Sequence, residues 1–285
     1  MPLARIDLHT HTTASDGSLL PTELVQLAKQ QGLSALAVTD HDSVAALPEA
    51  LAAGQRLGIR VIAGIEISCL HRDIELHILG YFIDQDHPDL KPTLARYLSS
   101  REDRNPKIIE RLCRLGVDVT YEEVKTLARS GTIGRPHIAR IMLKKGYVSS
   151  VADAFDRYLA DGGPAYVARV LPSAQEAIAF LRSIGGVPVL AHPTYGDRLK
   201  ISSDQLCAEL KGFGLAGLET LYSSHTARQT DRFRGIAREH ALLMTGGSDF
   251  HGDSKPDVLV GTGYGSLKVP IELLDEIQAA AEERS

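Results

Sequence analysis

Short runs of apolar residues alternate along most of the chain with segments in which apolar residues recur every three or four positions. The short runs are typical of buried strands, and the segments with helical spacing are typical of amphipathic helices. Strands are predicted at residues 5–8, 35–39, 60–66, 74–81, 187–191, 217–221 and 242–245. Helices are predicted at 21–31, 44–57, 175–184, 224–239 and 270–283. Repeated strand–helix units predict the α/β class, with a parallel sheet covered by helices.

The alternation stops between residues 99 and 168. Helical patterns follow one another there with no convincing strand between them, near 103–115, 121–129, 136–145 and 151–160. We predict a helical insertion, or cap domain, at 99–168 between a first barrel part at 1–98 and a second at 169–285. Loops at the mouth of a parallel barrel are free to vary, so an inserted cap is a common way to add substrate selectivity.

Histidines and carboxylates stand at the ends of the predicted strands. His9 and His11 lie two apart in the first strand, so their imidazoles point to the same face. Asp249 and His251 repeat this spacing late in the chain. Further residues in or just after strands are His41, Glu66, His77 and His192. Parallel strands gather their carboxyl ends at one face of a barrel, so the set predicts one metal centre, although any single histidine could be ordinary.

The residue types bound the metal and its chemistry. With Asp16, the set holds six imidazoles and three carboxylates but no thiolate, which suits Zn²⁺, Mn²⁺ or Fe. These nine residues exceed the needs of one ion, so two or three are expected, with a carboxylate such as Glu66 bridging them. No Gly-x-Ser-x-Gly motif or nucleophilic cysteine pattern is found, so metal-bound hydroxide is the expected nucleophile.

Three further carboxylates, Asp7, Asp40 and Asp42, flank the candidate ligands. Metal-bound imidazoles often donate their second N–H to a carboxylate, so these residues could orient the ligands. Strand-end caps or solvated charges are equally good interpretations of the same positions, and the sequence leaves the choice open.

Composition narrows the class of protein. Hydrophobic residues make up 44% of the 285 residues and charged residues 24%, as in an ordinary globular protein. No apolar run reaches 18 residues, which predicts no membrane span, and no signal-peptide pattern is found. Cys69, Cys113 and Cys207 are far apart in the sequence, which favours a reduced, cytoplasmic protein without disulfides.

The charges are unevenly distributed. The net charge of −5 argues against wholesale binding to nucleic acid. Residues 101–157 nevertheless hold 12 Lys and Arg against 8 Asp and Glu, whereas the rest of the chain holds 19 against 28. This basic segment coincides with the predicted insertion. It is typical either of a surface that recognises a phosphorylated substrate or of helices with solvated charged faces.

The candidate ligands stand in motifs that resemble those of the PHP (polymerase and histidinol phosphatase) phosphoesterase family. In sequence order the motifs are His9-Thr10-His11 with Asp16-Gly17, Thr39-Asp40-His41-Asp42, Gly64-Ile65-Glu66, His77, Ala191-His192-Pro193 and Gly247-Ser248-Asp249-Phe250-His251. The resemblance implies a distorted (β/α)7 TIM-like barrel with a trinuclear site of divalent ions, Mn²⁺ being the first choice and Zn²⁺ or Fe²⁺ the alternatives. The implied metal ligands are His9, His11, Asp16, His41, Glu66, His77, His192, Asp249 and His251. The reactive hydroxide would lie between metals held by His9, His11, Glu66, His192 and Asp249.

Within that family, the insertion is similar to that of a bacterial subgroup acting on nucleotide phosphates and short RNA 5′ ends. The residues that carry this similarity, and that it implies bind substrate, are Arg101, Arg104, Asn105, Gly134, Arg135 and His137. Arg101 and Arg104 share a helix face, Arg135 stands at a predicted helix start, and guanidinium groups bind phosphate through paired N–H groups. His137 could bind phosphate, protonate a leaving group or simply pack. Residues that could stack a base, or more ordinarily pack at the barrel rim, are Tyr166, Tyr195 and Tyr222.

We therefore expect a phosphomonoesterase that acts on a small nucleotide. Removal of the 3′-phosphate from a 3′,5′-bisphosphonucleotide, such as adenosine 3′,5′-bisphosphate, is the first choice. The enzymatic alternatives are a 5′→3′ exonuclease on short oligoribonucleotides and a histidinol phosphatase. A metal-binding accessory module without catalytic activity is the alternative from another class. Neither a membrane nor a long nucleic-acid duplex is an expected partner.

Overall fold

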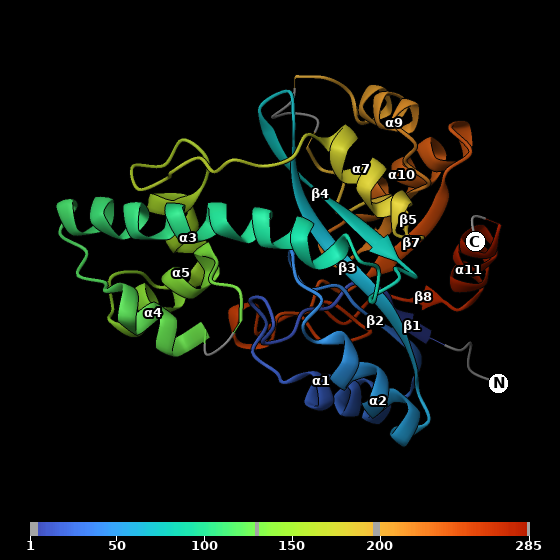
Figure 1. The fold of residues 1–285 in the computed structure, drawn as a ribbon, viewed down its shortest axis with the longest axis horizontal. Helices are drawn as coiled ribbons and strands as arrows, with labels where there is room; N and C mark the ends of the chain where they lie inside the picture. The colour runs from blue at the N-terminus through green and yellow to red at the C-terminus, as the bar shows by residue number, and fades with distance from the viewer. Residues whose placement is uncertain (1–4, 129–130, 196–199, 284–285) are drawn as a thin grey trace.

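The computed structural model describes residues 5–128, 131–195 and 200–283, and its centre is a sheet that curls into a nearly closed barrel (Figure 1). The strands are β1 (Arg5–Asp7), β2 (Leu33–Val38), β3 (Arg60–His71), β4 (Ile74–Tyr81), β5 (Val187–Leu190), β6 (Gly217–Tyr222), β7 (Leu243–Gly247) and β8 (Val269–Pro270). They lie in the order β7-β6-β5-β4-β3-β2-β1-β8. The barrel closes where the Leu8 N–H, just after β1, donates to the Gly246 carbonyl of β7 at 3.1 Å. The predicted distorted TIM-like barrel is thus confirmed.

Apolar residues on both faces explain why the strands read as continuous hydrophobic runs. In β2, Ala35 and Ala37 belong to the cluster inside the barrel, and Leu36 and Val38 to the cluster beneath the outer helices. Successive side chains of a strand point to opposite faces, so a strand buried on both faces needs apolar residues throughout.

Strand β4 departs from the parallel sheet that the repeated units predicted, because it runs antiparallel to both β3 and β5. It follows β3 in a hairpin whose two turn residues, Arg72 and Asp73, have φ of 49° and 62°. Two positive φ values suit the tight turn that joins antiparallel strands. The first half of β4 therefore lies at the barrel mouth, and His77 stands opposite Ser68.

Helices cover the outer surface and one end of the barrel (Figure 1). They are α1 (Pro21–Gln30), α2 (Leu47–Leu57), α7 (Ala174–Ser183), α9 (Ser203–Gly212), α10 (Ala227–Glu239) and α11 (Glu272–Glu282). Of these, α9 was not predicted, nor was the two-residue strand β8, which pairs with β1. Leu274 and Ile277 of α11 pack into the cluster inside the barrel, so this helix closes the end opposite the mouth.

Between β4 and α7 the chain forms a group of helices beside the barrel, on the left of Figure 1. They are α3 (Leu90–Arg114), α4 (Tyr121–Ala128), α5 (Arg135–Lys144), α6 (Val151–Ala154) and the π-helical turn η1 (Phe155–Leu159). They share a hydrophobic cluster that includes Leu112, Val124 and Ile138. Helix α3 runs unbroken past residue 99, so the proposed division at that residue lies within a helix and remains a prediction.

No helix among the described residues is long and apolar enough to cross a membrane.

Removing buried side-chain volume from the helices beside the barrel tests whether their cluster stabilises the fold. Leu112 is fully buried, and Leu115, just beyond the end of α3, is 46% exposed. We expect Leu112→Ala to lower the free energy of unfolding by about 2–5 kcal/mol. Leu115→Ala should change it by less than about 0.5 kcal/mol. Urea unfolding followed by circular dichroism measures both, and equal small effects would contradict a packed cluster.

Candidate metal centre

The carboxylate of Glu66 lies at the centre of the barrel mouth and is fully buried. Its Oε2 atom lies 3.3 Å from the Nε2 atoms of both His9 and His11 and 3.1 Å from Nδ1 of His41. These neighbours come from loops after two strands, β1 and β2, while Glu66 lies within β3. The three histidines lie just after strand ends, as predicted. Glu66 does not end its strand, because β3 continues beyond it to pair with β4.

The second oxygen of Glu66 faces two further histidines. Oε1 lies 2.9 Å from Nδ1 of His77 and 3.2 Å from Nε2 of His192. Those two nitrogens are themselves 3.3 Å apart. Each oxygen of one carboxylate therefore has its own group of imidazoles, which is the arrangement expected of a carboxylate that bridges two cations.

Two aspartates, Asp249 and Asp16, complete the site around His11 and His251. Asp249 Oδ1 lies 3.3 Å from His11 Nε2 and 3.3 Å from His251 Nδ1. Asp16 Oδ1 lies 3.2 Å from His251 Nε2, and Asp16 Oδ2 lies 3.8 Å from His41 Nε2. All nine residues predicted from the sequence are therefore brought together, and we refer to them as the ligand cluster.

The geometry of the ligand cluster fits cations. Its potential ligand atoms form groups in which all atoms lie within 4.8 Å of one another. The groups are His11, Asp16, His41 and His251; His9, Glu66 and His192; His9, His11 and Asp249; and His41, Glu66 and His77. Four buried side-chain atoms of the cluster have no hydrogen-bond partner: His9 Nε2, His11 Nε2, His41 Nδ1 and Glu66 Oε2. Leaving such an atom unsatisfied costs about 1–3 kcal/mol, which a bound divalent ion would offset.

The electrostatics of the cluster also favour positive charge at its centre. Burial lowers the pKa of His11 and His77, but the neighbouring carboxylates outweigh it and raise both values to about 9. Burial lowers the pKa of His41 to about 3. Carboxylates that draw protons onto adjacent imidazoles also attract metal ions, which compete with those protons for the same nitrogens.

Two ligands are held in a left-handed backbone conformation. His192 has φ of 28° and Asp249 has φ of 56°, although neither is glycine. Such positions cost of order 1–3 kcal/mol each and persist only where the surrounding structure holds them. They aim both side chains back into the barrel mouth, which is consistent with a functional constraint at these positions.

Glu219 in β6 orients two of the histidines and was missed by sequence reasoning. Its Oε1 lies 3.0 Å from His9 Nδ1, and its Oε2 accepts the His192 backbone N–H at 2.7 Å. The contact fixes which nitrogen of His9 faces the centre, a common arrangement behind metal-bound imidazoles. A carboxylate in the otherwise apolar sequence Gly-Leu-Glu-Thr-Leu-Tyr was the available signal, since buried charges require partners.

Two of the tyrosines considered for base stacking, Tyr195 and Tyr222, contact residues of the ligand cluster. Tyr195 Oη lies 2.7 Å from His192 Nδ1, and Tyr222 donates to Asp249 Oδ2 at 2.7 Å. Lys255, which was also missed, pairs with the same oxygen of Asp249. Tyr195 is only 7% exposed, so its ring is not available to a base.

Of the flanking carboxylates, two act as caps for the loops that carry the ligands. Asp7 accepts the backbone N–H groups of Ser248 at 2.8 Å and of Gly261 at 2.7 Å. Asp40 accepts the Thr12 N–H at 2.8 Å and the Thr12 hydroxyl at 2.7 Å. Both therefore fix the mouth of the barrel through its backbone, as the capping interpretation expected.

Asp42 instead anchors two arginines. Arg101 donates to Asp42 Oδ2 at 2.7 Å, and Arg169 donates to the same atom at 3.1 Å. Burial alone raises the pKa of Asp42, but these guanidinium groups hold it at about 2. Arg169 comes from the segment between η1 and α7, is almost fully buried and was not foreseen from the sequence.

Two more of the predicted arginines lie beside this pair. Arg135 donates to Glu75 Oε2 at 3.1 Å, and Arg169 lies 3.5 Å from the other oxygen of Glu75. Arg104 is buried and contacts the side-chain oxygen of Asn105 at 3.2 Å. Burial and the nearby guanidinium groups lower the pKa of Arg104 to about 8. We call Arg101, Arg104, Arg135 and Arg169 the arginine cluster. Arg135 also pairs with Asp161 at 3.4 Å, so four arginines face three carboxylates, and the remaining positive charge suits a bound anion.

Gly134 and His137 begin helix α5 next to both clusters. His137 Nδ1 accepts the Gly134 N–H at 3.1 Å, and burial lowers the pKa of His137 to about 4. A neutral imidazole that accepts this bond favours the packing role over the two chemical roles. A Cβ on Gly134 would lie 3.4 Å from Arg101 Nη1, an ordinary contact distance, so Gly134 lies directly beside Arg101.

The ligand cluster opens into a hollow of about 640 Å³. Its walls include Pro136, Val151 and Phe155 from the helices beside the barrel, and Lys255 and Tyr264 from barrel loops. An adjoining hollow of about 500 Å³ shares His77, His192, Thr194 and Phe155 with it and is lined by Arg135. The ligand cluster and Arg135 therefore border adjoining hollows, each of the size that small ligands need.

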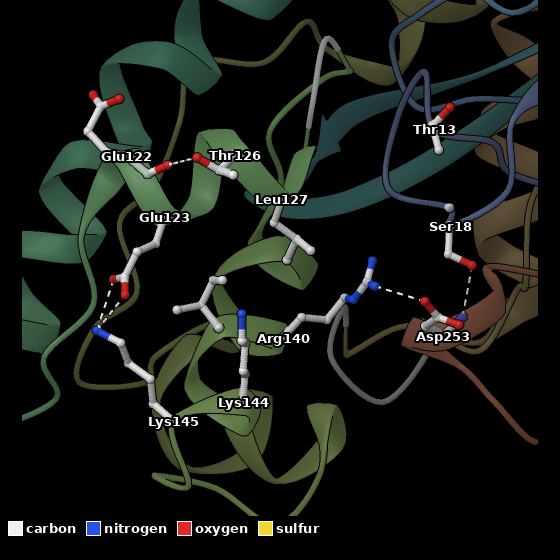
Figure 2. A pocket seen from close by; sticks show the side chains of 12 residues that line it. Thr13, Ser18, Glu122, Glu123, Thr126, Leu127, Arg140, Lys144, Lys145 and Asp253 are labelled. Atoms are coloured by element: carbon white, nitrogen blue, oxygen red, sulfur yellow. Dashed lines mark hydrogen bonds and ion pairs between the residues drawn. The ribbon is translucent and has the colours of Figure 1, made fainter.

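Figure 2 shows a second cleft, of about 790 Å³, between α4 and α5 and the loops of the barrel. Arg140 pairs with Asp253 at 3.0 Å, and Lys145 pairs with Glu123 at 2.8 Å (Figure 2). The Asp253 N–H in turn donates to the hydroxyl of Ser18 at 3.1 Å. The contacts of Asp253 tie α5 to the loops after β1 and β7. This cleft therefore lies where the helices beside the barrel meet the barrel itself.

Comparison with known proteins agrees with the barrel and its cluster. The family model of the PHP domain matches residues 7–161. A 5′-3′ exoribonuclease of Haemophilus influenzae is 36% identical over 87% of this chain and 90% of its own length. A 3′,5′-nucleoside bisphosphate phosphatase of Chromobacterium violaceum is 32% identical over 87% of this chain and 88% of its own.

The same agreement extends to solved structures. The structure of a Bifidobacterium adolescentis protein, described as a candidate metal-dependent phosphoesterase, superposes with a TM-score of 0.89 and 32% identity. The superposition covers 98% of this chain and 96% of the Bifidobacterium adolescentis chain. Fold and site together define a metal-dependent phosphoesterase, a hydrolase. The chain belongs to the PHP domain family.

Replacing Glu219 tests whether its contacts prepare the histidines for metal. Glu219→Gln keeps the size of the side chain but removes the charge behind His9, so we expect the affinity for divalent metal to fall about 10- to 100-fold. Metal titration and metal content after dialysis measure this change. The control is Glu209→Gln, because Glu209 also contacts a histidine, His71, at 2.8 Å but lies outside the ligand cluster. Full metal retention by Glu219→Gln would contradict the assigned role.

Proposed function

We propose that this protein is a metal-dependent phosphomonoesterase that removes the 3′-phosphate from a 3′,5′-bisphosphonucleotide, for example adenosine 3′,5′-bisphosphate. One observation carries the proposal: the ligand cluster borders one hollow, and Arg135 of the arginine cluster borders an adjoining hollow that shares His77 and His192 with it. A nucleotide with two phosphate groups matches a space with two regions suited to anions. The bisphosphate phosphatase among the relatives supports the same substrate class.

The proposed metal ligands are the nine residues of the ligand cluster. They suit three divalent ions, with Mn²⁺ as first choice and Zn²⁺ or Fe²⁺ as alternatives, because imidazole and carboxylate ligands accept all three metals. Such ions would polarise the phosphoryl oxygens of the substrate and activate a water molecule. The residues that would hold the reacting group in place are His9, His11, Glu66, His192 and Asp249.

The protein itself supplies orientation and charge around the reacting group. Glu219 and Tyr195 hold His9 and His192 in position through their second ring nitrogens. Lys255 lines the hollow beside Asp249 and brings a positive charge to the side where a phosphoryl group would lie. Fixed groups of this kind stabilise developing charge more than mobile water does, because they are already oriented.

The arginine cluster is the proposed site of the phosphate that does not react. Four guanidinium groups face three carboxylates there, Asp42, Glu75 and Asp161, which leaves an excess of one positive charge. Arg135 lines the adjoining hollow directly, and guanidinium groups bind phosphate through paired N–H groups. Arg101, Arg104, Asn105, Gly134 and His137 support it from behind in this proposal. Histidinol phosphate carries one phosphate and makes less use of this charge.

A second candidate function is 5′→3′ exonuclease activity on short oligoribonucleotides. The exoribonuclease of Haemophilus influenzae, at 36% identity over most of both chains, favours it. The same two clusters would then hold the cleaved phosphodiester and a neighbouring phosphate. A small nucleotide or a short oligonucleotide is the proposed partner in either case.

The free thiols of Cys69, Cys113 and Cys207 support a proposed cytoplasmic location.

Phosphate release from a panel of compounds tests the proposed function. The panel contains adenosine 3′,5′-bisphosphate, a 5′-phosphorylated dinucleotide, histidinol phosphate and a generic phosphate ester, each with Mn²⁺ added. We expect the bisphosphonucleotide to give the highest kcat/KM. Faster cleavage of the dinucleotide would favour the exonuclease, and turnover of none of the four by metal-loaded protein would favour an accessory module.

Substitution of Arg135 tests the second phosphate site. Arg135→Ala removes charge-assisted hydrogen bonds worth about 1.5–3 kcal/mol, so kcat/KM for the bisphosphonucleotide should fall about 10- to 150-fold. Turnover of the generic ester should change little. Arg157→Ala serves as the control, because that side chain is half exposed and lies outside the arginine cluster. Unchanged nucleotide turnover in Arg135→Ala would overturn this part of the proposal.

A further inference from the structure

Tyr264 is an exposed aromatic residue at the rim of the hollow that contains the ligand cluster. It lines that hollow, yet 59% of the residue is exposed to solvent. Single exposed aromatic residues are common on protein surfaces and need no explanation by themselves. What distinguishes Tyr264 is its position and the loop that carries it.

The loop that carries Tyr264 is fixed by its own hydrogen bonds. Leu259 and Gly263 exchange two backbone bonds of 2.8 Å, and the Gly265 N–H donates to the Thr262 carbonyl at 2.8 Å. Gly263 and Gly265 flank Tyr264 with φ of 54° and 98°, which side chains other than glycine rarely adopt. An aromatic ring on such a loop loses little freedom when a ligand binds.

The same loop is joined to the backbone around the ligand cluster. The Gly261 N–H donates to Asp7 Oδ2 at 2.7 Å, and Asp7 Oδ1 accepts the Ser248 N–H at 2.8 Å. Gly263 packs so closely on Ser223 that a Cβ would lie 2.4 Å from its Oγ. Tyr264 is therefore held at a set position relative to Asp249, which directly follows Ser248.

Apart from Asp156, the wall contributed by the helices beside the barrel is apolar. Pro136, Val151 and Phe155 line the hollow from α5, α6 and η1. The floor of the hollow is polar, because His77, Asp249 and other ligands form it. A ligand that suits this space has an anionic end for the floor and a flat, partly apolar end for the walls.

We propose that Tyr264 is a substrate-binding residue that stacks on the base of a nucleotide whose phosphate lies at the ligand cluster. This inference rests on the proposed function. It concerns the base, which is the part of the nucleotide that metal ions at the phosphate would not contact. Stacking on an aromatic ring tolerates all bases, since each base has a flat π face. The site therefore selects nucleotides over sugar phosphates without selecting one base.

The experiment compares a nucleotide with a substrate that lacks the base. Tyr264→Ala should lower kcat/KM for adenosine 3′,5′-bisphosphate about 5- to 150-fold, chiefly through KM, as expected for a lost stacking contact. Hydrolysis of ribose 5-phosphate should stay within about twofold. Tyr264→Phe keeps the ring and should recover most of the loss. Leu259→Ala is the matched control, because Leu259 is 54% exposed in the same loop but is not among the residues that line the hollow.

Direct binding of AMP, measured by calorimetry on the metal-loaded protein, separates this inference from the proposed function. If wild-type protein cleaves no nucleotide but binds AMP in a Tyr264-dependent manner, the inference stands and the proposed function fails. Equal losses on both substrates in Tyr264→Ala would assign the residue to the loop structure instead. Unchanged affinity and turnover in that variant, or no AMP binding by wild-type protein, would overturn the inference.

Discussion

The buried carboxylate of Glu66 among histidines is the interaction on which the rest of the structure depends. Taking an ionised carboxylate out of water is costly unless it is paired. Burial raises the pKa of Glu66, but His41, His9 and His77 outweigh it and hold the value well below its usual range. The barrel must therefore bring several imidazoles to one point, and the imidazoles in turn need carboxylates or cations beside them. This mutual dependence explains why the ligands come from loops and strands all around the mouth.

The outer layers of the site serve the same constraint in different ways. Glu219 fixes ring nitrogens, Asp7 and Asp40 fix backbone, and Asp42 holds buried arginines. Each of these carboxylates lies within hydrogen-bond reach of several groups. Replacing any one of them would therefore remove several contacts at once. The reversed strand β4 belongs to the same scheme, because its direction brings His77 to the mouth and Glu75 to the arginines.

Sequence reasoning located the ligand cluster because its signals are local: a two-residue spacing in a strand and a polar residue after an apolar run. It missed contacts that depend on which strands become neighbours. Glu219 lies 210 positions from His9, and Asp42 lies 127 positions from Arg169. The direction of β4 depended on a two-residue turn, Arg72-Asp73, which lacks the glycine that usually marks such a hairpin. Arg101, Arg104 and Arg135 were found, but Arg169 and the pairing of the cluster with Asp42 and Glu75 could be recognised only in three dimensions.

The hollow above the ligand cluster has two walls that come from different parts of the chain. The barrel contributes the floor and one wall, and the helices between β4 and β5 contribute the other. Mutations in those helices can therefore reshape the space offered to a substrate while the residues of the ligand cluster keep their places. In evolutionary terms, the chain separates its chemistry from its choice of molecule, so relatives that share one barrel can diverge in what they cleave.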